Sequence, residues 1–341
     1  MSREKKRARI LAIALVALLG AVASGCGEKE DGTAGEPEPF TIGLDFYVNP
    51  DHAGLFTALQ RGYFEEAGLE VETQVPSDPS APIKQVAAER LDLAISYEPE
   101  VMLARDEGLP VVAVAALVPQ PLTSLISLPK AGIAEAADLS GKTIATAGIP
   151  YQTAFLEAIL DDAGLSAEDV DQVDVGLGLL PAVISGRADA ILGGFLNVEG
   201  VDLAERGEKP RVTPVDELGI PTYDELVLVA NSDRVDEDPE PLRLFIAALE
   251  RGTREAVEDP VAATDAVLNA GEGLDPKLTA AEVERTLPLL LPEREGQPFG
   301  YMDSDEWEAF GGFLADQALI ERRPSASDLF TDELLPGEIP E

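Results

Sequence analysis

The chain has 341 residues, and 64 Asp and Glu against 25 Lys and Arg give it a formal net charge of −39 at pH 7. Nucleic acid and anionic lipid headgroups are bound through basic surfaces, so this charge argues against both as partners. Cys26 and His52 are the only residues of their kinds, which excludes a disulfide and a Cys/His metal centre and leaves carboxylates only for a weakly held hard cation. We therefore expect no cofactor.

Residues 1–25 have the pattern of an export signal. Five basic residues within the first nine precede an apolar run over residues 10–22 that is short for a membrane span. Small residues then stand directly before Cys26, which is typical of a bacterial lipoprotein processing site. We expect Cys26 to be the lipidated N-terminus, with an ordinary signal peptide as the alternative, and residues 26–39 to be a flexible tether.

The stretch Thr41–Val75 predicts a strand, a helix and a second strand. Asn49 followed by proline is a favourable helix start, Gly62 is a suitable helix end, and apolar and polar residues alternate from Leu69. In such βαβ units the ligand crevice lies beyond the carboxyl ends of the strands. We therefore expect a binding site directly after Thr41–Phe46.

A polar cluster stands at this junction, namely Asp45, Asn49, Asp51 and His52. The helix dipole favours a neutral imidazole near a helix N-terminus. Two interpretations are open at this point. Either the cluster binds a ligand, or Asn49 and Asp51 cap the helix while His52 faces water.

A second junction follows the apolar run Leu91–Ser96, which is short enough for a buried parallel strand. Tyr97 and Glu98 leave the end of this strand, and Pro99 opens the next helix. We expect both side chains to project into the same crevice as His52. A simple helix-entry turn, with Glu98 as a cap, is the alternative. Residues 111–117 and 122–128 read as two further strands.

The middle of the chain repeats this organisation. Residues 138–145 predict a turn into a strand, and Tyr151 in the following segment is able to stack on an aromatic ligand or to pack at a helix start. A strand over residues 188–192 leads to two glycines and then to Asn197 and Glu199. Glycines after a strand permit close backbone approach, so we expect these two side chains at the opposite wall of the cleft, although Glu199 could instead be a solvent-facing loop residue.

The last third of the chain is mostly helical. The chain from Cys26 onward is long enough for two lobes with substantial cores. A strand over residues 225–230 is expected to cross back into the first lobe, which makes the connection between the lobes double and permits hinge closure. Helices are predicted over residues 239–258, 260–270, 278–291 and 305–319. Trp307, Phe310 and Phe313 are expected to fill the core. The tail from residue 324 is expected to be ordered only in part.

Four short signatures in the first two thirds of the chain resemble a known family. They are D-x-x-x-N-x-x-H-x-G-L with G-Y-F-x-E-x-G-L-x-V from Asp45, D-x-x-I-S-Y-x-P-E from Asp92, D-L-x-G-K-x-I from Asp138, and G-G-x-x-N-x-E-G from Gly193. Together they are similar to the periplasmic-type solute-binding proteins for thiamine-pyrimidine (HMP) precursors. The eukaryotic enzymes that synthesise the HMP pyrimidine share that scaffold.

The resemblance implies an α/β, two-lobed periplasmic-binding-protein fold of type II-like topology, with the ligand cleft between the lobes. Lobe 1 is then expected to comprise residues 40–128 and 227–341, and lobe 2 residues 129–226. The function implied is that of a monomeric, extracytoplasmic lipoprotein subunit of an ABC importer, anchored to the bacterial cell membrane through Cys26. It would bind an aminopyrimidine-like solute non-covalently and deliver it to a membrane permease.

The ligand-binding residues implied are Asp45, Phe46, Asn49, His52, Tyr97, Glu98, Tyr151, Asn197 and Glu199. Residues 148–155 have no cysteine where the eukaryotic synthases carry a cysteine-rich iron-linked motif, so we expect a binding protein rather than an enzyme. Because Phe46 stands where family members often carry tryptophan, riboflavin, a sulfonate or a purine remains an alternative cargo. A pyrimidine-forming enzyme that uses His52, and a scaffolding lipoprotein, are further alternatives.

Overall fold

The computed structural model describes residues 37–292 and 296–337. The expected signal segment and Cys26 lie outside these residues. In the part of the chain that is described, no helix is both long and apolar enough to cross a membrane. Two five-stranded mixed sheets organise the fold, and we call the parts built on them lobe 1 and lobe 2.

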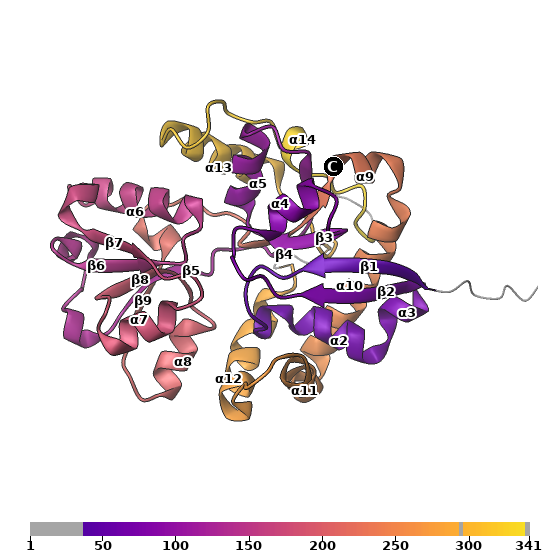
Figure 1. The fold of residues 1–341 in the computed structure, drawn as a ribbon, viewed down its shortest axis with the longest axis horizontal. Helices are drawn as coiled ribbons and strands as arrows, with labels where there is room; N and C mark the ends of the chain where they lie inside the picture. The colour runs from indigo at the N-terminus through magenta and orange to yellow at the C-terminus, as the bar shows by residue number, and fades with distance from the viewer. Residues whose placement is uncertain (1–36, 293–295, 338–341) are drawn as a thin grey trace, which may run out of the picture. The chain divides into compact units, whose positions relative to one another are not determined.

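The sheet of lobe 1 has the strand order β2-β1-β3-β10-β4 (Figure 1). Its strands are β1 (Glu38–Gly43), β2 (Leu69–Gln74), β3 (Leu93–Ser96), β4 (Val111–Val118) and β10 (Leu226–Asn231). β1 pairs in parallel with β2 and β3, whereas β10 is antiparallel to both of its neighbours. β1 begins two residues inside the expected tether, because Glu38 and Pro39 pair with Leu69 and Glu70.

The sheet of lobe 2 has the equivalent order β7-β6-β8-β5-β9. Its strands are β5 (Thr123–Ser127), β6 (Thr143–Thr146), β7 (Asp171–Asp174), β8 (Ala190–Phe195) and β9 (Arg211–Pro214). Here β5 is antiparallel to β8 and β9, while β6 pairs in parallel with β7 and β8. Each sheet thus receives one antiparallel strand, β10 or β5, directly after the chain crosses from the other lobe.

The pairing of β5 corrects the lobe boundary expected from the sequence. Residues 122–128 were assigned to lobe 1 as its last strand, but β5 pairs only with strands of lobe 2 among the described strands. A continuous apolar strand is suitable for either sheet, so its composition does not reveal its partner. The chain therefore crosses between the lobes at residues 119–122 and returns at residues 219–225.

Helices cover both faces of each sheet. Figure 1 shows α2, α3, α10 and α11 on one face of the lobe 1 sheet and α4, α5, α13 and α14 on the other, with α6 opposite α7 and α8 on the lobe 2 sheet. Their bounds are α2 (Ala53–Arg61), α3 (Tyr63–Glu66), α4 (Pro82–Ala87), α5 (Glu98–Asp106), α6 (Pro150–Asp162), α7 (Leu179–Ser185), α8 (Glu199–Glu205), α9 (Ser232–Glu237), α10 (Glu240–Glu258), α11 (Pro260–Ala270), α12 (Pro276–Thr286), α13 (Ser304–Asp316) and α14 (Ala326–Leu329). Short 3₁₀ turns are η1 (Pro50–His52), η2 (Pro129–Ala131), η3 (Ala136–Leu139), η4 (Ala167–Asp169), η5 (Val215–Leu218) and η6 (Leu287–Leu289).

The first βαβ unit forms as its local signals predict. The Asn49 side chain accepts a hydrogen bond from the Asp51 backbone N–H and starts η1, which runs directly into α2. Gly62 ends α2 in a left-handed conformation with φ of 74°, which a residue without a Cβ adopts without steric cost. This unit places Asp45 and the residues after it at the carboxyl end of β1.

The core of lobe 1 depends on close packing between α2 and α10. A Cβ at Gly252 of α10 would lie 2.4 Å from the Gly54 carbonyl oxygen of α2, so only glycine permits this approach. Phe245 of α10 stacks on Phe40 and Phe64 with ring centroids 5.0 and 4.7 Å apart. The helix pair thereby supports η1, which directly follows the pocket-lining residues Asp45–Asn49.

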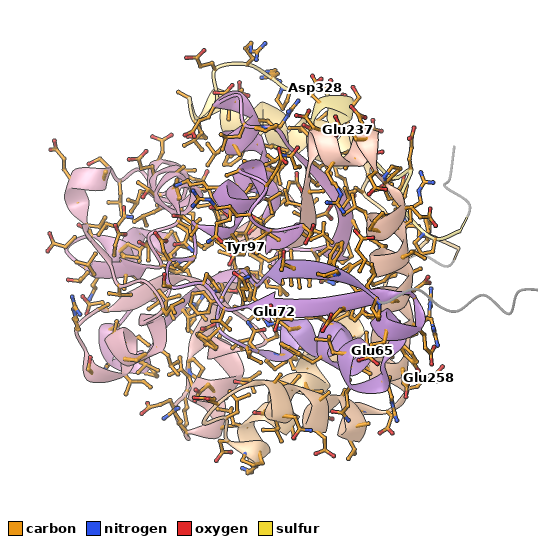
Figure 2. The ribbon with its side chains drawn as sticks, turned by 45° about the vertical axis from the view of Figure 1, so that its right-hand side comes forward. Glu65, Glu72, Tyr97, Glu237, Glu258 and Asp328 are labelled. Atoms are coloured by element: carbon orange, nitrogen blue, oxygen red, sulfur yellow. The ribbon has the colours of Figure 1, made fainter. Side chains whose placement is uncertain are left out.

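Acidic side chains lie both on the surface and in the interior of the described residues. Figure 2 shows Glu65, Glu237 and Glu258 directed away from the fold, whereas Tyr97 lies inside it. Trp307 and Phe310 are buried and Phe313 is half-buried, which confirms that these rings fill the core. The tail beyond residue 324 contributes α14, and Phe330 forms a bridge to Ala113 of β4, so the tail up to residue 335 packs against lobe 1.

Candidate functional site

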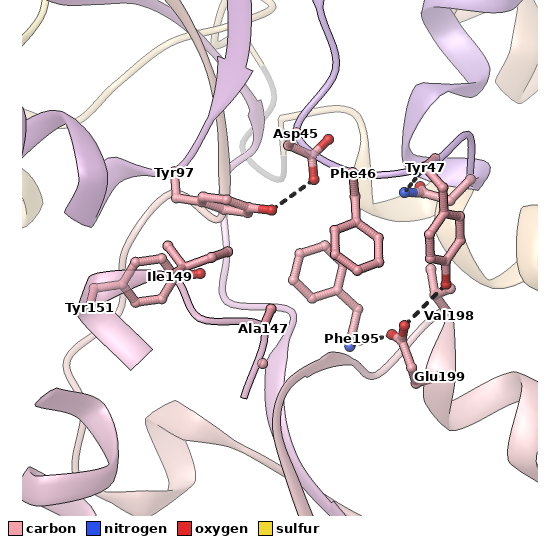
Figure 3. Close-up of a pocket in the computed structure, with 12 residues that line it drawn as sticks. Asp45, Phe46, Tyr47, Tyr97, Ala147, Ile149, Tyr151, Phe195, Val198 and Glu199 are labelled. Carbon is pink, nitrogen blue, oxygen red and sulfur yellow. Dashed lines mark hydrogen bonds between the residues drawn. The ribbon is translucent and has the colours of Figure 1, made fainter. Parts of the chain in front are cut away.

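A pocket of about 380 Å³ opens where the carboxyl ends of the parallel strands of both sheets meet (Figure 3). Lobe 1 supplies residues that follow β1 and β3, and lobe 2 supplies residues that follow β6 or end β8. The lining residues are Asp45, Phe46, Tyr47, Asn49 and Tyr97 from lobe 1, and Ala147, Ile149, Tyr151, Gly193, Phe195, Val198 and Glu199 from lobe 2.

Asp45 is the centre of the lobe 1 wall. Its Oδ1 lies 2.8 Å from His52 Nε2, and its Oδ2 accepts a hydrogen bond of 2.9 Å from the Tyr97 hydroxyl. The Asn49 backbone N–H donates to His52 Nδ1 at 3.3 Å. Because an N–H can only donate, Nδ1 carries no proton, and Nε2 is the nitrogen that donates to Asp45. The imidazole of His52 therefore orients the Asp45 side chain through Nε2.

Glu199 is the acidic residue of the lobe 2 wall. It is the first residue of α8, and its Oε2 accepts a hydrogen bond of 2.8 Å from the Phe195 backbone N–H. Its Oε1 accepts one of 3.2 Å from the Tyr47 hydroxyl of lobe 1. Burial of the side chain raises the pKa of Glu199 above its usual value. Both oxygens keep a lone pair for a further donor.

Aromatic rings form much of the remaining lining. Phe46 and Tyr47 pack with centroids 4.6 Å apart, and Tyr97 and Tyr151 with centroids 5.6 Å apart across the two lobes. Figure 3 shows the ring of Phe195 beside that of Phe46. Burial holds the pKa of Tyr97 and of Tyr151 well above the usual range, so both hydroxyls keep their protons. The pocket thus presents aromatic faces with a few fixed polar groups.

Asn197 joins the two lobes outside the pocket. Its side-chain N–H₂ donates to Asp51 Oδ1 at 2.7 Å and to Thr286 Oγ1 at 2.8 Å. Asn197 is fully buried, and burial raises the pKa of Asp51 well above its usual value. Asp51 and Thr286 belong to lobe 1, so Asn197 holds the lobes together instead of lining the pocket.

Glu98 also lies away from the pocket. Its Oε2 accepts a hydrogen bond of 2.7 Å from the Asp224 backbone N–H, in the segment that returns to lobe 1. Asp224 in turn accepts a bond of 2.7 Å from the Trp307 indole N–H. Burial, with a further contribution from the Asp224 charge, raises the pKa of Glu98 well above its usual value. The sequence placed Glu98 in the crevice, and the structure places it at the hinge.

Glu225 ties the two crossing segments together. One carboxylate accepts hydrogen bonds from the backbone N–H groups of Leu122 and Thr123 at 2.7 and 2.6 Å. It also accepts from the Thr123 and Tyr223 hydroxyls, each at 2.9 Å. Burial raises the pKa of Glu225 to about 7. We call Glu98, Asp224 and Glu225 the hinge carboxyls.

The structure therefore brings together most of the residues expected from the sequence. Asp45, Phe46, Asn49, Tyr97, Tyr151 and Glu199 line one pocket, whereas His52 lies behind Asp45, and Glu98 and Asn197 make contacts elsewhere. Sequence reasoning missed Tyr47, Ile149 and Phe195 as lining residues. Tyr47 and Phe195 are aromatic neighbours of expected site residues, and that adjacency was the available signal.

Among residues 37–292 and 296–337, no group of three or more His, Cys, Asp or Glu is arranged to hold a metal ion.

Comparisons with known proteins show which family this chain belongs to. A family model described as NMT1/THI5 like matches residues 49–263. The chain is 37% identical over 298 residues to the formylaminopyrimidine-binding protein of Halalkalibacterium halodurans, covering 86% of this chain and 90% of that protein. This chain belongs to the NMT1/THI5-like family. It is also 28% identical over 237 residues to the 4-amino-5-hydroxymethyl-2-methylpyrimidine phosphate synthase of Aspergillus parasiticus, covering 66% of this chain and 69% of that enzyme.

Solved structures confirm the fold of this family member. The alkanesulfonate-binding protein SsuA from Xanthomonas axonopodis pv. citri bound to MOPS superposes with a TM-score of 0.69 and 18% identity, covering 87% of this chain and 99% of that protein. At this identity the likeness concerns the fold alone. Both the family and the two-lobed periplasmic-binding-protein fold predicted from the sequence are thus confirmed.

Proposed function

We propose that this protein is a solute-binding protein that holds an aminopyrimidine, of the formylaminopyrimidine or HMP type, non-covalently between its lobes. The observation that carries the proposal is the position of Glu199. Its carboxylate is buried in an aromatic-lined pocket, is held in place by the Phe195 N–H and the Tyr47 hydroxyl, and keeps free lone pairs. The relative from Halalkalibacterium halodurans, whose name gives its ligand as formylaminopyrimidine, supports this cargo.

The chemistry of the pocket is suitable for such a ligand. An aminopyrimidine offers an exocyclic N–H₂ donor, ring nitrogens that accept, and two aromatic faces. Glu199 would accept from the amino group, while Phe46 and Phe195 would contact the ring faces.

The lining also bears on the alternative cargoes. The residues around the pocket include the carboxylates of Asp45 and Glu199 but neither lysine nor arginine. A sulfonate carries a full negative charge, which these carboxylates would repel. An aminopyrimidine is therefore favoured over a sulfonate.

Binding is favoured over catalysis. Both ring nitrogens of His52 are engaged within lobe 1, Nδ1 by the Asn49 N–H and Nε2 by Asp45, so neither is available to react with a ligand. Residues 148–155 supply no cysteine. We propose that the protein is not an enzyme and differs in this respect from the synthases of its family.

The proposed setting follows from the N-terminal sequence. Residues 1–25 would direct export, and lipidated Cys26 would anchor the protein outside the cytoplasm on the bacterial cell membrane. The protein would act as a monomer and pass its solute to the permease of an ABC importer. The residue ranges of the two lobes, with β5 moved to lobe 2, belong to the same proposal.

Native mass spectrometry of the purified full chain, followed by a thermal-shift panel, tests the proposed function. The panel would contain formylaminopyrimidine, HMP, riboflavin and an alkanesulfonate. We expect a mass adduct of pyrimidine size and an increase in melting temperature with the pyrimidines alone, because a ligand that binds only the folded state stabilises it. A shift with riboflavin or the sulfonate, and none with either pyrimidine, would overturn the proposed cargo.

A further inference from the structure

A second cavity adjoins the pocket, between α12 of lobe 1 and α7 and α8 of lobe 2. Its empty space, part of which is open to solvent, is about 480 Å³, and it shares Tyr47, Asn49, Val198 and Glu199 with the pocket. Residues that line both spaces stand between them, so the Tyr47–Glu199 hydrogen bond of 3.2 Å forms part of the common wall. Figure 3 shows this bond at the edge of the pocket. Rotation of the Tyr47 side chain would join the two spaces.

Four carboxylates line this second cavity, and three of them already have partners. Glu199 accepts from Tyr47 and Phe195, Asp202 is bonded to Arg206, and Asp275 caps α12 through the N–H groups of Lys277 and Leu278. Glu282 is different. The residue as a whole is 8% exposed, and among the described residues its carboxylate has neither a hydrogen-bond nor an ion-pair partner. A buried carboxylate without a hydrogen-bond or ion-pair partner destabilises the fold, unless a bound group takes the place of that partner.

The surroundings of Glu282 leave it in a strongly negative environment. Burial and the charges of Asp202, Glu199 and Asp51 raise the pKa of Glu282 to about 8, against an opposing effect from Arg206. Arg206 is itself bonded to Asp202, and Lys277, the other basic residue nearby, is bonded to Glu205 at 2.7 Å. Neither basic side chain is therefore available to neutralise Glu282.

The rest of the lining indicates what kind of cation would fit. Leu180, Val267 and Leu278 contribute apolar side chains to the same lining as the carboxylates. Within residues 37–292 and 296–337 the acidic side chains are not grouped for a metal ion. A cavity lined by both carboxylates and apolar side chains is suited to an organic cation, whose hydrocarbon part contacts the apolar residues while its charge pairs with an acid.

We propose that the second cavity is a subsite for a positively charged substituent, an ammonium group or a cationic ring, carried by an aminopyrimidine whose ring occupies the pocket. This inference rests on the proposed function and extends it to a second class of solute. Glu282 is the residue that pairs with the cation. The Tyr47 hydroxyl would move away from Glu199 to admit the substituent.

A matched pair of probes tests the inference by isothermal titration calorimetry on the purified full chain near neutral pH. The neutral probe is 4-amino-5-formylaminomethyl-2-methylpyrimidine, and the charged probe is its free amine, an ammonium ion under these conditions. We expect Glu282→Gln to weaken binding of the charged probe about tenfold, because this probe loses its charge partner. The affinity for the neutral probe should stay unchanged. Glu284→Gln, an exposed position on the same helix, is the control and should alter neither affinity.

A second readout separates charge pairing from a change of shape. Titrations in two buffers of different ionisation enthalpy measure the protons released on binding. We expect proton release with the charged probe, since the cation favours the ionised form of Glu282, and a smaller release in Glu282→Gln. The neutral probe should release none from this residue.

The outcomes distinguish this inference from the proposed function. If the neutral probe binds but the charged probe does not, or if Glu282→Gln weakens both probes equally, the cationic subsite is wrong and the proposed function stands. If neither probe binds the wild-type chain, both are wrong.

Discussion

The pocket and the hinge both depend on buried carboxyl groups, but they use them differently. In the pocket, Asp45 and Glu199 each accept hydrogen bonds from the protein and still face an open cavity. At the hinge, Glu225 accepts four hydrogen bonds from the two crossing segments and lines none of the described cavities. A buried carboxylate thus indicates a ligand site only when it faces a space that its protein partners leave unfilled.

Substitutions at the hinge and in the pocket should therefore affect different properties of the protein. Loss of a hinge carboxyl removes the acceptor of several buried donors and should lower stability. Loss of a pocket carboxyl should lower affinity for the solute while stability changes little. The predictions below test that separation, beginning with the largest expected effect.

Glu225→Ala should reduce the free energy of unfolding by about 3–5 kcal/mol, because it leaves the Leu122 and Thr123 N–H groups buried without their acceptor. Urea denaturation followed by circular dichroism measures the change. Glu217→Ala, at an exposed position just before the same crossing segment, is the control. A change below about 1 kcal/mol in Glu225→Ala would show that the hinge bonds do not stabilise the fold.

The stability of the wild-type protein should fall as pH rises from about 4.5 to about 7, the ordinary and the raised pKa of Glu225. Over this interval the folded state keeps a proton on Glu225 that the unfolded state has lost, so folding binds a proton and becomes less favourable with rising pH. This residue would account for up to about 3 kcal/mol of the decrease. Urea midpoints across the interval measure it, and Glu225→Gln should flatten the profile.

Glu199→Gln should weaken binding of formylaminopyrimidine about tenfold to hundredfold, because the exocyclic amino group loses a charged acceptor. Its melting temperature should stay close to that of the wild type, since an amide oxygen still accepts from Phe195 N–H. Calorimetry gives the affinity, and Glu208→Gln at an exposed site after α8 is the control. Equal affinities in variant and wild type would remove Glu199 from the site.

Glu98→Gln should change the affinity for the same ligand by less than about twofold, because Glu98 bonds to Asp224 and does not line the pocket. The neighbouring residue Tyr97 does line the pocket, so the prediction distinguishes two adjacent residues. Calorimetry under the same conditions measures the difference. A loss of affinity as large as that of Glu199→Gln would return Glu98 to the site predicted from the sequence.

Local signals in the sequence predicted the elements that carry the lobe 1 wall. The Asn49-Pro50 start, the Gly62 end and the strand from Leu69 depend on neighbouring residues, and the structure contains all three. The position after β3 was also correct for Tyr97. It was not correct for Glu98, because α5 begins at Glu98 and the side chain bonds to the Asp224 backbone N–H at the hinge. Tyr97 reaches the pocket, and Glu98 reaches the hinge.

Contacts between distant segments could not be predicted in the same way. Asn197 and Asp51 are 146 positions apart, and Glu225 and Leu122 are 103 apart. These bonds exist because the two lobes meet, which no local pattern specifies. The same limitation explains why β5 was assigned to the wrong sheet, since pairing with β8 and β9 is determined by the crossing of the chain.

The most direct test of the proposed function is a crystal structure of the protein with formylaminopyrimidine. We predict that the pyrimidine ring lies against Phe46 and Phe195, with its exocyclic amino nitrogen about 3 Å from a carboxylate oxygen of Glu199. His52 should remain behind Asp45, out of contact with the ring. A ligand bound outside the pocket, or a pocket that stays empty at saturating ligand, would contradict the account.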